Sequence, residues 1–172
     1  MKINSLLGGG IFCDLRKAFN CVNHTILLSK LEFYDILGNA YYLMKSYLND
    51  RYQRVLINNT NSKNYFSEWE KTKSGVPHGS TVCPLLFLLY INDLPGSINN
   101  LSKSTLFADD TNITFTHTNL TEFKEEINKV FEKIIIWFQN NLLSLNLNKT
   151  YYMQFMPKTN YAVNLNTNYE TK

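Results

Sequence analysis

The amino-acid sequence predicts an α+β fold in which helices pack on one face of a largely antiparallel sheet. Apolar runs of strand length alternate with helical segments, in the order strand, helices, hairpin, helix, strand pair, helix, strand. From Leu120 to Leu145 the apolar residues keep a 3.6-residue period, which indicates a long amphipathic helix. Two strand-like runs flank Asp109 and Asp110, which places two acidic residues at the tip of a hairpin.

The first half of the chain predicts a strand, two helices and a projecting hairpin. Three glycines precede the apolar run Ile11–Cys13, which suits a buried strand that ends at Asp14. Asn23 is placed to cap a helix that ends at Gly38, and a second helix follows. The hairpin is expected where two strand-like runs flank a polar turn, at residues 53–58 and 65–71.

The second half predicts a buried helix, a strand pair, the long helix and a closing strand. Ser80 ends a glycine-rich loop and can cap a helix that continues to Leu94. Thr105–Ala108 and Asn112–Phe115 form the strand pair around the acidic residues. Residues 151–156 alternate as the closing strand. The tail at 158–172, rich in Asn and Thr, is predicted to be disordered.

The composition fits one globular domain. The chain has 172 residues, of which 44% are hydrophobic and 18% charged, and its net charge of +3 permits a polyanionic partner without requiring one. The three cysteines form no close pair, which argues against a disulfide framework or a zinc site. The run Pro84–Ile91 is too short to cross a bilayer, and the N-terminus lacks the pattern of a secretory signal. We expect an intracellular protein, nuclear or cytoplasmic, that is not secreted and has no membrane partner.

Asp14, Asp109 and Asp110 are the candidate reactive residues. If the first strand lies beside the acidic hairpin, three carboxylates converge at one sheet edge and their repulsion calls for a divalent cation. Oxygen ligands favour Mg²⁺ or Mn²⁺, and two such ions about 3.5–4 Å apart assist in-line phosphoryl displacement. The plainer alternative is a solvated strand end and an ordinary polar turn. Spacing alone leaves both interpretations open.

Four motifs occur along the chain in a fixed order. D-L-R-K-A-F begins at Asp14, and G-V-P-H-G-S begins at Gly75 and leads into P-L-L-F at Pro84. F-A-D-D ends at Asp110, and the last motif consists of Trp137, Asn141, Leu145, Asn146, Lys149 and Thr150. Together they resemble the motifs D-x-x-K-A-F, G-V-P-Q-G-S…P-L-L-F, F-A-D-D and W…N-x-L-x-L-N-x-x-K-T of jockey-like reverse transcriptases from non-LTR retrotransposons. The resemblance spans residues 11–155, nearly the whole chain.

The resemblance implies the palm of an RNA-directed DNA polymerase with part of its fingers, over residues 1–157. It implies two Mg²⁺ or Mn²⁺ ions, with an RNA template, a DNA primer and a deoxynucleoside triphosphate as partners. Asp14, Asp109 and Asp110 would be catalytic metal ligands, and Lys149 would donate a proton to the departing pyrophosphate. The residues that would contact the nucleotide are Leu15, Phe19, Pro77, His78 and Gly79, with Phe19 excluding a 2′-hydroxyl sterically. Considered alone, Phe19 would be ordinary core and Lys149 an ordinary surface residue.

Three positions depart from the family pattern. His78 stands where the pattern has glutamine, Cys83 where it has glycine, and Asn20 where it has aspartate. Three interpretations follow: a polymerase fragment that acts by two-metal catalysis, an inactive retroelement remnant with weak nucleic-acid or protein binding, and a small RNA-recognition module. The module interpretation ranks last, because the sequence lacks the aromatic strand motif of such modules. The sequence gives no indication of the oligomeric state.

Overall fold

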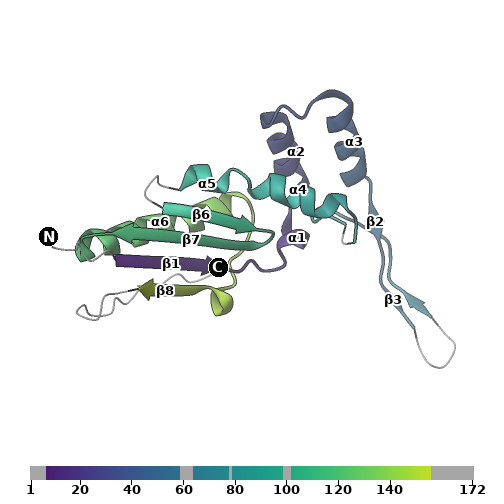
Figure 1. The fold of residues 1–172 in the computed structure, drawn as a ribbon. Coiled ribbons are helices and arrows are strands. Elements are labelled where there is room, and N and C mark those ends of the chain that lie inside the picture. Colours follow the sequence, from purple (N-terminus) through teal and green to yellow (C-terminus); the bar gives the residue numbers. More distant parts are fainter. Residues whose placement is uncertain (1–6, 59–63, 78, 99–101, 156–172) are drawn as a thin grey trace. The chain divides into compact units, whose positions relative to one another are not determined.

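The structure, a computed structural model, describes residues 7–58, 64–77, 79–98 and 102–155 (Figure 1). The chain divides into two compact units. The sheet unit contains residues 1–18 and 92–172, and the helical unit contains residues 19–91. Within the described residues, no helix has both the length and the apolar character that a membrane span needs.

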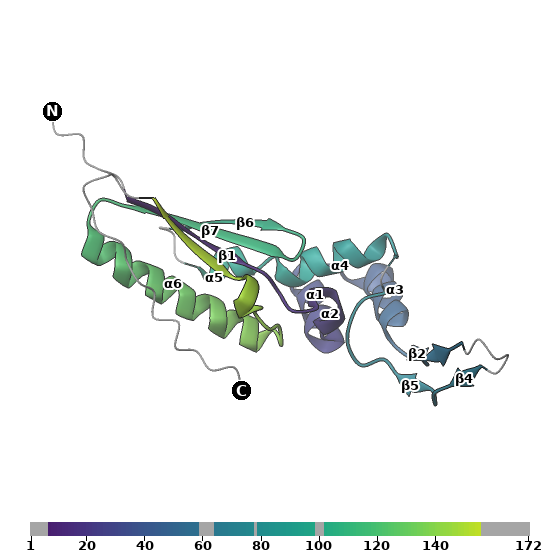
Figure 2. The same cartoon turned by 90° about the horizontal axis from the view of Figure 1, so that it is seen from below.

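The sheet unit is built on an antiparallel sheet whose strand order is β6–β7–β1–β8. The first strand of the chain therefore lies in the interior of the sheet. The strands are β1 (Leu7–Cys13), β6 (Ser102–Phe107), β7 (Asp110–His117) and β8 (Tyr151–Phe155), and the unit also contains α5 (Leu94–Ser97), α6 (Leu120–Asn140) and the 3₁₀ helix η1 (Leu147–Lys149). Helix α6 runs along one face of the sheet (Figure 2). The predicted α+β fold with an antiparallel sheet is confirmed.

The core of the sheet unit lies between α6 and one face of the sheet. The buried residues of α6 keep a helical spacing: Phe123, Ile127, Val130, Ile134, Trp137 and Phe138. Successive side chains of a strand point to opposite faces of its sheet. In β1, Ile11 and Cys13 are buried whereas Phe12 is only half-buried, and in β7, Ile113 and Phe115 are buried. The opposite face of the sheet is therefore available to polar side chains.

Glycine in β1 allows α6 to approach the sheet. The strand begins at Leu7 and runs through all three glycines, whereas the sequence predicted a strand only from Ile11. The packing explains the difference. A Cβ atom on Gly9 would lie 2.9 Å from the Cζ atom of Phe123, a fully buried residue of α6. Glycine is unfavourable in a strand when judged locally, but here the close aromatic ring requires it.

The helical unit combines packed helices with a long hairpin. Its elements are α1 (Ala18–Cys21), α2 (His24–Phe33), α3 (Gly38–Leu48), α4 (Val82–Ile91), β2 (Tyr52–Gln53), β3 (Leu56–Ile57), β4 (Tyr65–Phe66) and β5 (Glu70–Lys71). Helix α2 contacts both α3 and α4. Strand β2 pairs with β5 and β3 pairs with β4, so the two pairs form one hairpin that extends away from the helices of this unit (Figure 1).

One predicted helix cap is confirmed, whereas three helices end at other residues than predicted. The side-chain oxygen of Asn23 accepts a hydrogen bond from the backbone N–H of Ile26 at 3.1 Å, which confirms the predicted cap of α2. Helix α2 ends before Gly38, because Asp35 adopts a left-handed φ of +58°. Helix α6 likewise ends at Asn140 rather than residue 145, since Leu142 has a φ of +53°. Helix α4 ends at Ile91 rather than residue 94, and a separate short helix follows.

Some predictions fall outside the described residues. These are the tip of the polar hairpin turn at 59–63, His78 and the tail at 158–172. Where the predicted strand pair is described, β6 and β7 are longer than expected and meet at a turn of only two residues.

We predict that Gly9→Ala destabilises the protein. The new methyl group meets the ring of Phe123, which is buried and has little room to move, so we expect a loss of about 1–3 kcal/mol in the free energy of unfolding. Gly8→Ala is the matched control, because a Cβ there lies 3.7 Å from the Phe155 Cβ, an ordinary contact. Urea unfolding of both variants measures the difference. Equal stability of the two variants would contradict this account of β1.

Candidate active site

Two of the predicted acidic residues meet on the polar face of the sheet. Strands β1 and β7 are antiparallel, and their register pairs Cys13 with Thr111. The next step of this register brings Asp14 opposite Asp110, and alternation turns both side chains away from α6. They line an open pocket of about 370 Å³, whose lining residues are Phe12, Cys13, Asp14, Asp110, Asn112, Lys149 and Tyr151.

The segment after α6 holds Asp14 in position. Leu15 forms an isolated antiparallel bridge with Leu145. The backbone N–H of Asn146 donates to the carbonyl oxygen of Asp14 at 2.8 Å, and its Nδ2 atom donates to Oδ2 of the same residue at 2.9 Å. Both the backbone and the carboxylate of Asp14 are thus oriented by one residue. The sequence placed Asn146 in a motif without a role, so this positioning function was missed.

Asp109 lies in the turn between β6 and β7. Because Phe107 pairs with Asp110, Ala108 and Asp109 form a two-residue turn. Of these two residues only Ala108 has a positive φ, at +51°, which is the pattern of a type II′ turn. Asp109 is partly exposed and does not line the carboxylate pocket. The turn therefore keeps the two acids adjacent while only Asp110 faces the pocket.

A cation and a buried thiol border the carboxylates. Lys149 is exposed, and its backbone N–H donates to the carbonyl oxygen of Asn146 at 2.9 Å, which links it to the residue that orients Asp14. Cys13 is buried, and this burial raises the pKa of its thiol to about 12. The thiol is therefore protonated and neutral at pH 7, and it does not add to the charge of the pocket.

The donor set of the pocket fits a hard divalent cation. Asp14 and Asp110 present carboxylate oxygens, which Mg²⁺ and Mn²⁺ prefer, and Asp109 is adjacent in the chain. Among the residues that the structure describes, no group of three or more His, Cys, Asp or Glu side chains could hold a metal ion. Mg²⁺ commonly binds through one or two carboxylates and leaves the remaining coordination to waters and substrate phosphates. Two pocket carboxylates are consistent with that kind of site.

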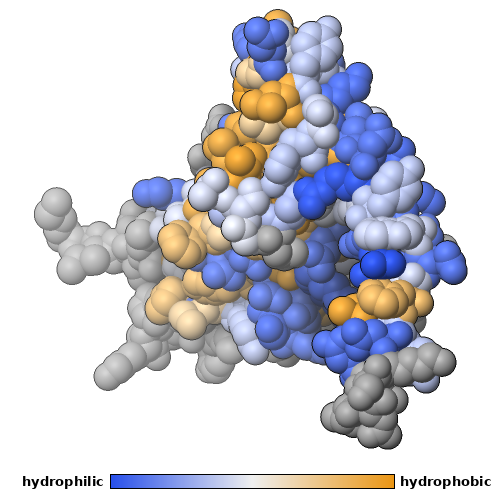
Figure 3. Space-filling view, turned by 90° about the vertical axis from the view of Figure 1, so that its right-hand side faces the viewer, coloured by the Kyte–Doolittle hydropathy of each residue, from blue (hydrophilic) through white to orange (hydrophobic). Residues whose placement is uncertain are grey.

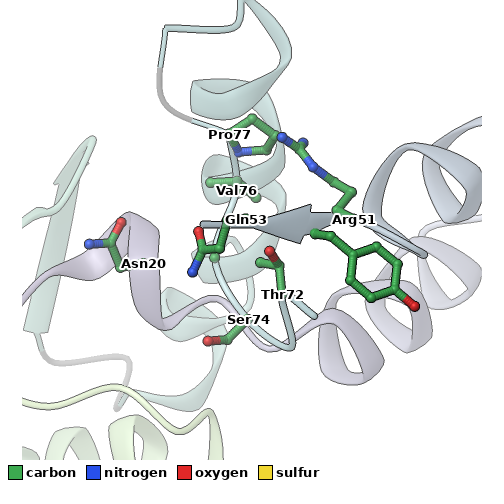
Figure 4. Close-up of a pocket in the computed structure, with 9 residues that line it drawn as sticks. Asn20, Arg51, Gln53, Thr72, Ser74, Val76 and Pro77 are labelled. Carbon is green, nitrogen blue, oxygen red and sulfur yellow. The ribbon is translucent and has the colours of Figure 1, made fainter. Parts of the chain in front are cut away.

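The helical unit has its own pocket, of about 470 Å³. Figure 4 shows that its lining comes from α1, the base of the hairpin and the loop that follows the hairpin. The lining residues are Asn20, Arg51, Tyr52, Gln53, Thr72, Ser74, Gly75, Val76 and Pro77. Most of these side chains are polar, and Arg51 supplies a positive charge. Pro77 is the predicted nucleotide contact that lines this pocket.

The loop at residues 74–77 is fixed to the beginning of α2. Gly75 has a φ of +86°, and a Cβ atom there would lie 3.0 Å from the carbonyl oxygen of Asn20, so the position requires glycine. The Nε2 atom of His24 lies 2.8 Å from the carbonyl oxygen of Gly75, within hydrogen-bond distance. An isolated antiparallel bridge also joins Asn23 to Ser74. His24 belongs to none of the sequence motifs described above.

The other predicted nucleotide contacts lie in varied surroundings. Leu15 is buried in the core of the sheet unit. Phe19 is half-buried and packs against Phe87 in the helical unit, with ring centroids 4.7 Å apart. Gly79 is exposed and adopts a φ of +83°, a conformation that favours glycine. His78 lies outside the described residues.

Two of the departures from the family pattern can be located. Asn20 is exposed and lines the pocket of the helical unit. Cys83 is buried in α4 and does not line that pocket, and burial raises the pKa of its thiol. The Cys83 side chain therefore takes part in the packing of α4 and does not form part of the pocket surface.

Comparison with known sequences gives one consistent result. A model of the family "Reverse transcriptase (RNA-dependent DNA polymerase)" matches residues 6–165. The chain is 29% identical to a probable RNA-directed DNA polymerase from transposon BS of Drosophila melanogaster, over 87% of this chain and 16% of that protein. It is 24% identical to the RNA-directed DNA polymerase from mobile element jockey of the same organism, again over 87% and 16%. The chain therefore spans about a sixth of the length of these relatives.

Comparison with solved structures shows the same fold. The apo telomerase of Candida tropicalis, truncated from its C-terminal domain, matches with a TM-score of 0.66 and 15% identity, over 90% of this chain and 32% of the telomerase chain. Telomerase from the same organism in complex with a fragment of telomeric RNA matches with a TM-score of 0.57 and 12% identity, over 89% and 27%. The α+β fold is thus that of a polymerase palm.

We predict that Mg²⁺ or Mn²⁺ raises the melting temperature of the chain, because a cation that binds only the folded state stabilises it by mass action. Asp110→Asn should remove most of this rise, since it takes one carboxylate from the pocket. Asp109→Asn, in the adjacent turn, should also reduce it. Asp35→Asn is the matched control, because it is an exposed carboxylate of the helical unit. A rise that is equal in the wild type, Asp110→Asn and Asp35→Asn would remove the evidence for a shared site.

Proposed function

The chain belongs to the reverse transcriptase (RNA-dependent DNA polymerase) family, and we propose that it is the palm of an enzyme that adds deoxynucleotides to a primer 3′-hydroxyl. The observation that supports this activity is the pocket in which Asp14 and Asp110 face the same space beside Lys149. Nucleotidyl transfer develops negative charge on the attacking and leaving oxygens, and the two carboxylates could hold divalent cations that, with Lys149, would offset that charge.

We assign separate tasks to the residues of this pocket. Asp14 and Asp110, with Asp109 from the adjacent turn, would hold the divalent cations. Bound there, Mg²⁺ or Mn²⁺ would lower the pKa of the attacking hydroxyl and neutralise charge on the leaving group. Lys149 would offset the charge of the departing pyrophosphate and supply its proton. Asn146 keeps the Asp14 carboxylate in one orientation, so that no reorganisation is needed when the substrate binds.

The proposed substrates are an RNA template, a DNA primer and a deoxynucleoside triphosphate. The curated relatives are named as RNA-directed DNA polymerases, which supports this substrate class. Phe19 would exclude a 2′-hydroxyl, and its ring packs against that of Phe87 with centroids 4.7 Å apart. The pocket of the helical unit, with Pro77 and the cationic Arg51, offers polar groups for a nucleotide.

A second candidate is an inactive retroelement remnant, and the three departures from the family pattern favour it. Asn20 lies in the pocket of the helical unit, where it replaces a charged residue of the pattern with a neutral one. Cys83 adds a buried side chain to α4 at a position where the family pattern has glycine, which has no side chain. Asn20 thus changes the surface of the pocket and Cys83 changes the packing of α4, while Asp14, Asp109 and Asp110 are retained.

We predict that the isolated chain does not extend a primer on an RNA template above background. Catalysis of this kind depends on positioning, and a displacement of about 1 Å can reduce the rate about a hundredfold. Binding a primer and template needs many contacts between basic side chains and phosphates. A chain with a net charge of +3 can make few of them. A primer-extension assay with Mg²⁺ and with Mn²⁺ tests this, with Asp109→Asn/Asp110→Asn as the matched control. Extension that depends on these two aspartates would show that the palm alone suffices.

A chimaera separates the polymerase from the remnant. We predict that residues 7–155, placed in the jockey polymerase in exchange for the matching segment, support extension that depends on Asp110. His78→Gln in the chimaera should increase the rate, because it restores the side chain of the family pattern. Extension by neither the chimaera nor its His78→Gln variant, with the protein folded, would favour the remnant.

A further inference from the structure

The hairpin of the helical unit carries an exposed group of one arginine and two aromatic rings. The guanidinium carbon of Arg54 lies 4.2 Å from the ring centroid of Phe66 and 4.6 Å from that of Trp69. Phe66 is 52% exposed and Trp69 is 58% exposed. We call these three residues the stacking cluster. Each ring contacts the guanidinium of Arg54, and each aromatic residue is about half exposed to solvent.

A β-bulge brings the cluster together. Gln53 pairs with Glu70 and Leu56 pairs with Phe66, so two residues on one strand face three on the other. The bulge is stabilised by Ser67, whose backbone N–H donates to the carbonyl oxygen of Val55 at 3.0 Å and whose Oγ accepts from the N–H of that residue at 2.9 Å. The extra residue brings Trp69 into contact with Arg54.

The two faces of the hairpin differ. Phe66 shares its face with its partner Leu56, and the adjacent pair of Tyr65 and Ile57 points to the other side, because successive side chains alternate. Tyr65 is 54% exposed, nearly the same as Phe66. These neighbours are therefore matched in size and exposure, but only Phe66 contacts the cation of the cluster.

We propose that the stacking cluster binds single-stranded nucleic acid by stacking on its unpaired bases. Aromatic rings and the plane of an arginine guanidinium are the surfaces on which such bases stack, and this contact tolerates any sequence. Arg54 also offers a positive charge to the phosphates. Among the described residues of the hairpin and its base, 50–58 and 64–73, basic side chains outnumber acidic ones, and the acidic Asp50 pairs with Lys71 at 2.8 Å.

The surface around the cluster suits a polyanion better than an apolar protein partner. Figure 3 shows that apolar side chains of the hairpin, in orange, lie directly beside strongly hydrophilic ones in blue, near the grey tip. An apolar interface would have to desolvate these hydrophilic groups, which is costly. A nucleic-acid strand stacks its bases on the rings and keeps its phosphates in water. Glu68 and Glu70, the two acidic residues on either side of Trp69, oppose a polyanion.

The test is oligonucleotide binding by the full chain in EDTA, which keeps the carboxylate pocket out of the measurement. Fluorescence anisotropy with labelled oligo(U) and oligo(dT) of about 16 nucleotides distinguishes RNA from DNA. We expect Phe66→Ala and Trp69→Ala each to weaken binding about fivefold or more, which corresponds to the lower end of the measured stacking contribution. Tyr65→Ala, the matched control, should change the Kd less than about twofold. Arg54→Lys should also weaken binding, because it keeps the charge but loses the planar group.

Other measurements make the proposal falsifiable in several ways. Glu68→Gln should strengthen binding, since it removes a negative charge beside the cluster. Binding should quench the fluorescence of Trp69, and Trp69→Phe should lose that signal while it retains most of the affinity. Equal losses in Phe66→Ala and Tyr65→Ala, or no oligonucleotide binding at all, would overturn the proposal. So would sedimentation data in which Phe66→Ala abolishes self-association while the Kd for oligonucleotide is unchanged, because the cluster would then be a protein interface.

This proposal does not rest on the polymerase function. All of its residues are exposed on the hairpin, and none of them lines either pocket. Variants of the cluster should bind Mg²⁺ as the wild type does, and Asp110→Asn should bind oligonucleotide as the wild type does in EDTA. Failure of either function would leave the other intact.

Discussion

The register between β1 and β7 is the constraint on which the carboxylate pocket depends. Side chains alternate along a strand, so a shift of one residue would turn Asp14 toward α6 and expose Cys13. The buried side chains of Ile11, Ile113 and Phe115 oppose this shift, because it would move them into solvent. The bridge between Leu15 and Leu145 fixes the end of the strand independently. The same apolar packing that stabilises the sheet therefore decides which face carries the acids.

Sequence patterns predicted the elements that local chemistry determines. The cap at Asn23 and the long amphipathic helix α6 follow from side chains that act within one or two turns. The extent of β1 could not be predicted in this way. Glycine is a poor strand former by itself, and only the tertiary contact with Phe123 explains why Gly9 lies inside the strand.

In the candidate site too, the sequence predicts what local chemistry determines and not what tertiary contacts determine. Strand ends and a hairpin tip are positions that the sequence can identify, which is why the sequence predicts that Asp14 and Asp110 lie near one another, as they do in the pocket. The support of these residues depends on contacts between distant segments. Asn146 reaches Asp14 across 132 positions of the chain, and His24 reaches Gly75 across 51. Neither residue carries a sequence signal of its own, because an asparagine or a histidine serves many local purposes equally well.

The two-residue turn between β6 and β7 is short because Ala108 adopts a strained backbone conformation. A type II′ turn favours glycine at its first central position, and alanine there, at a φ of +51°, carries strain of about 1 kcal/mol or more. Such a residue persists only where its surroundings determine the backbone. Here six residue pairs join β6 to β7 directly before and after the turn, and seven pairs join β7 to β1. These pairings determine the backbone at the turn. A longer, relaxed loop would remove the strain, but it would also free Asp109 and Asp110 from the strand that aligns Asp110 with Asp14. The strained turn and the shared pocket are therefore two consequences of the same strand pairing.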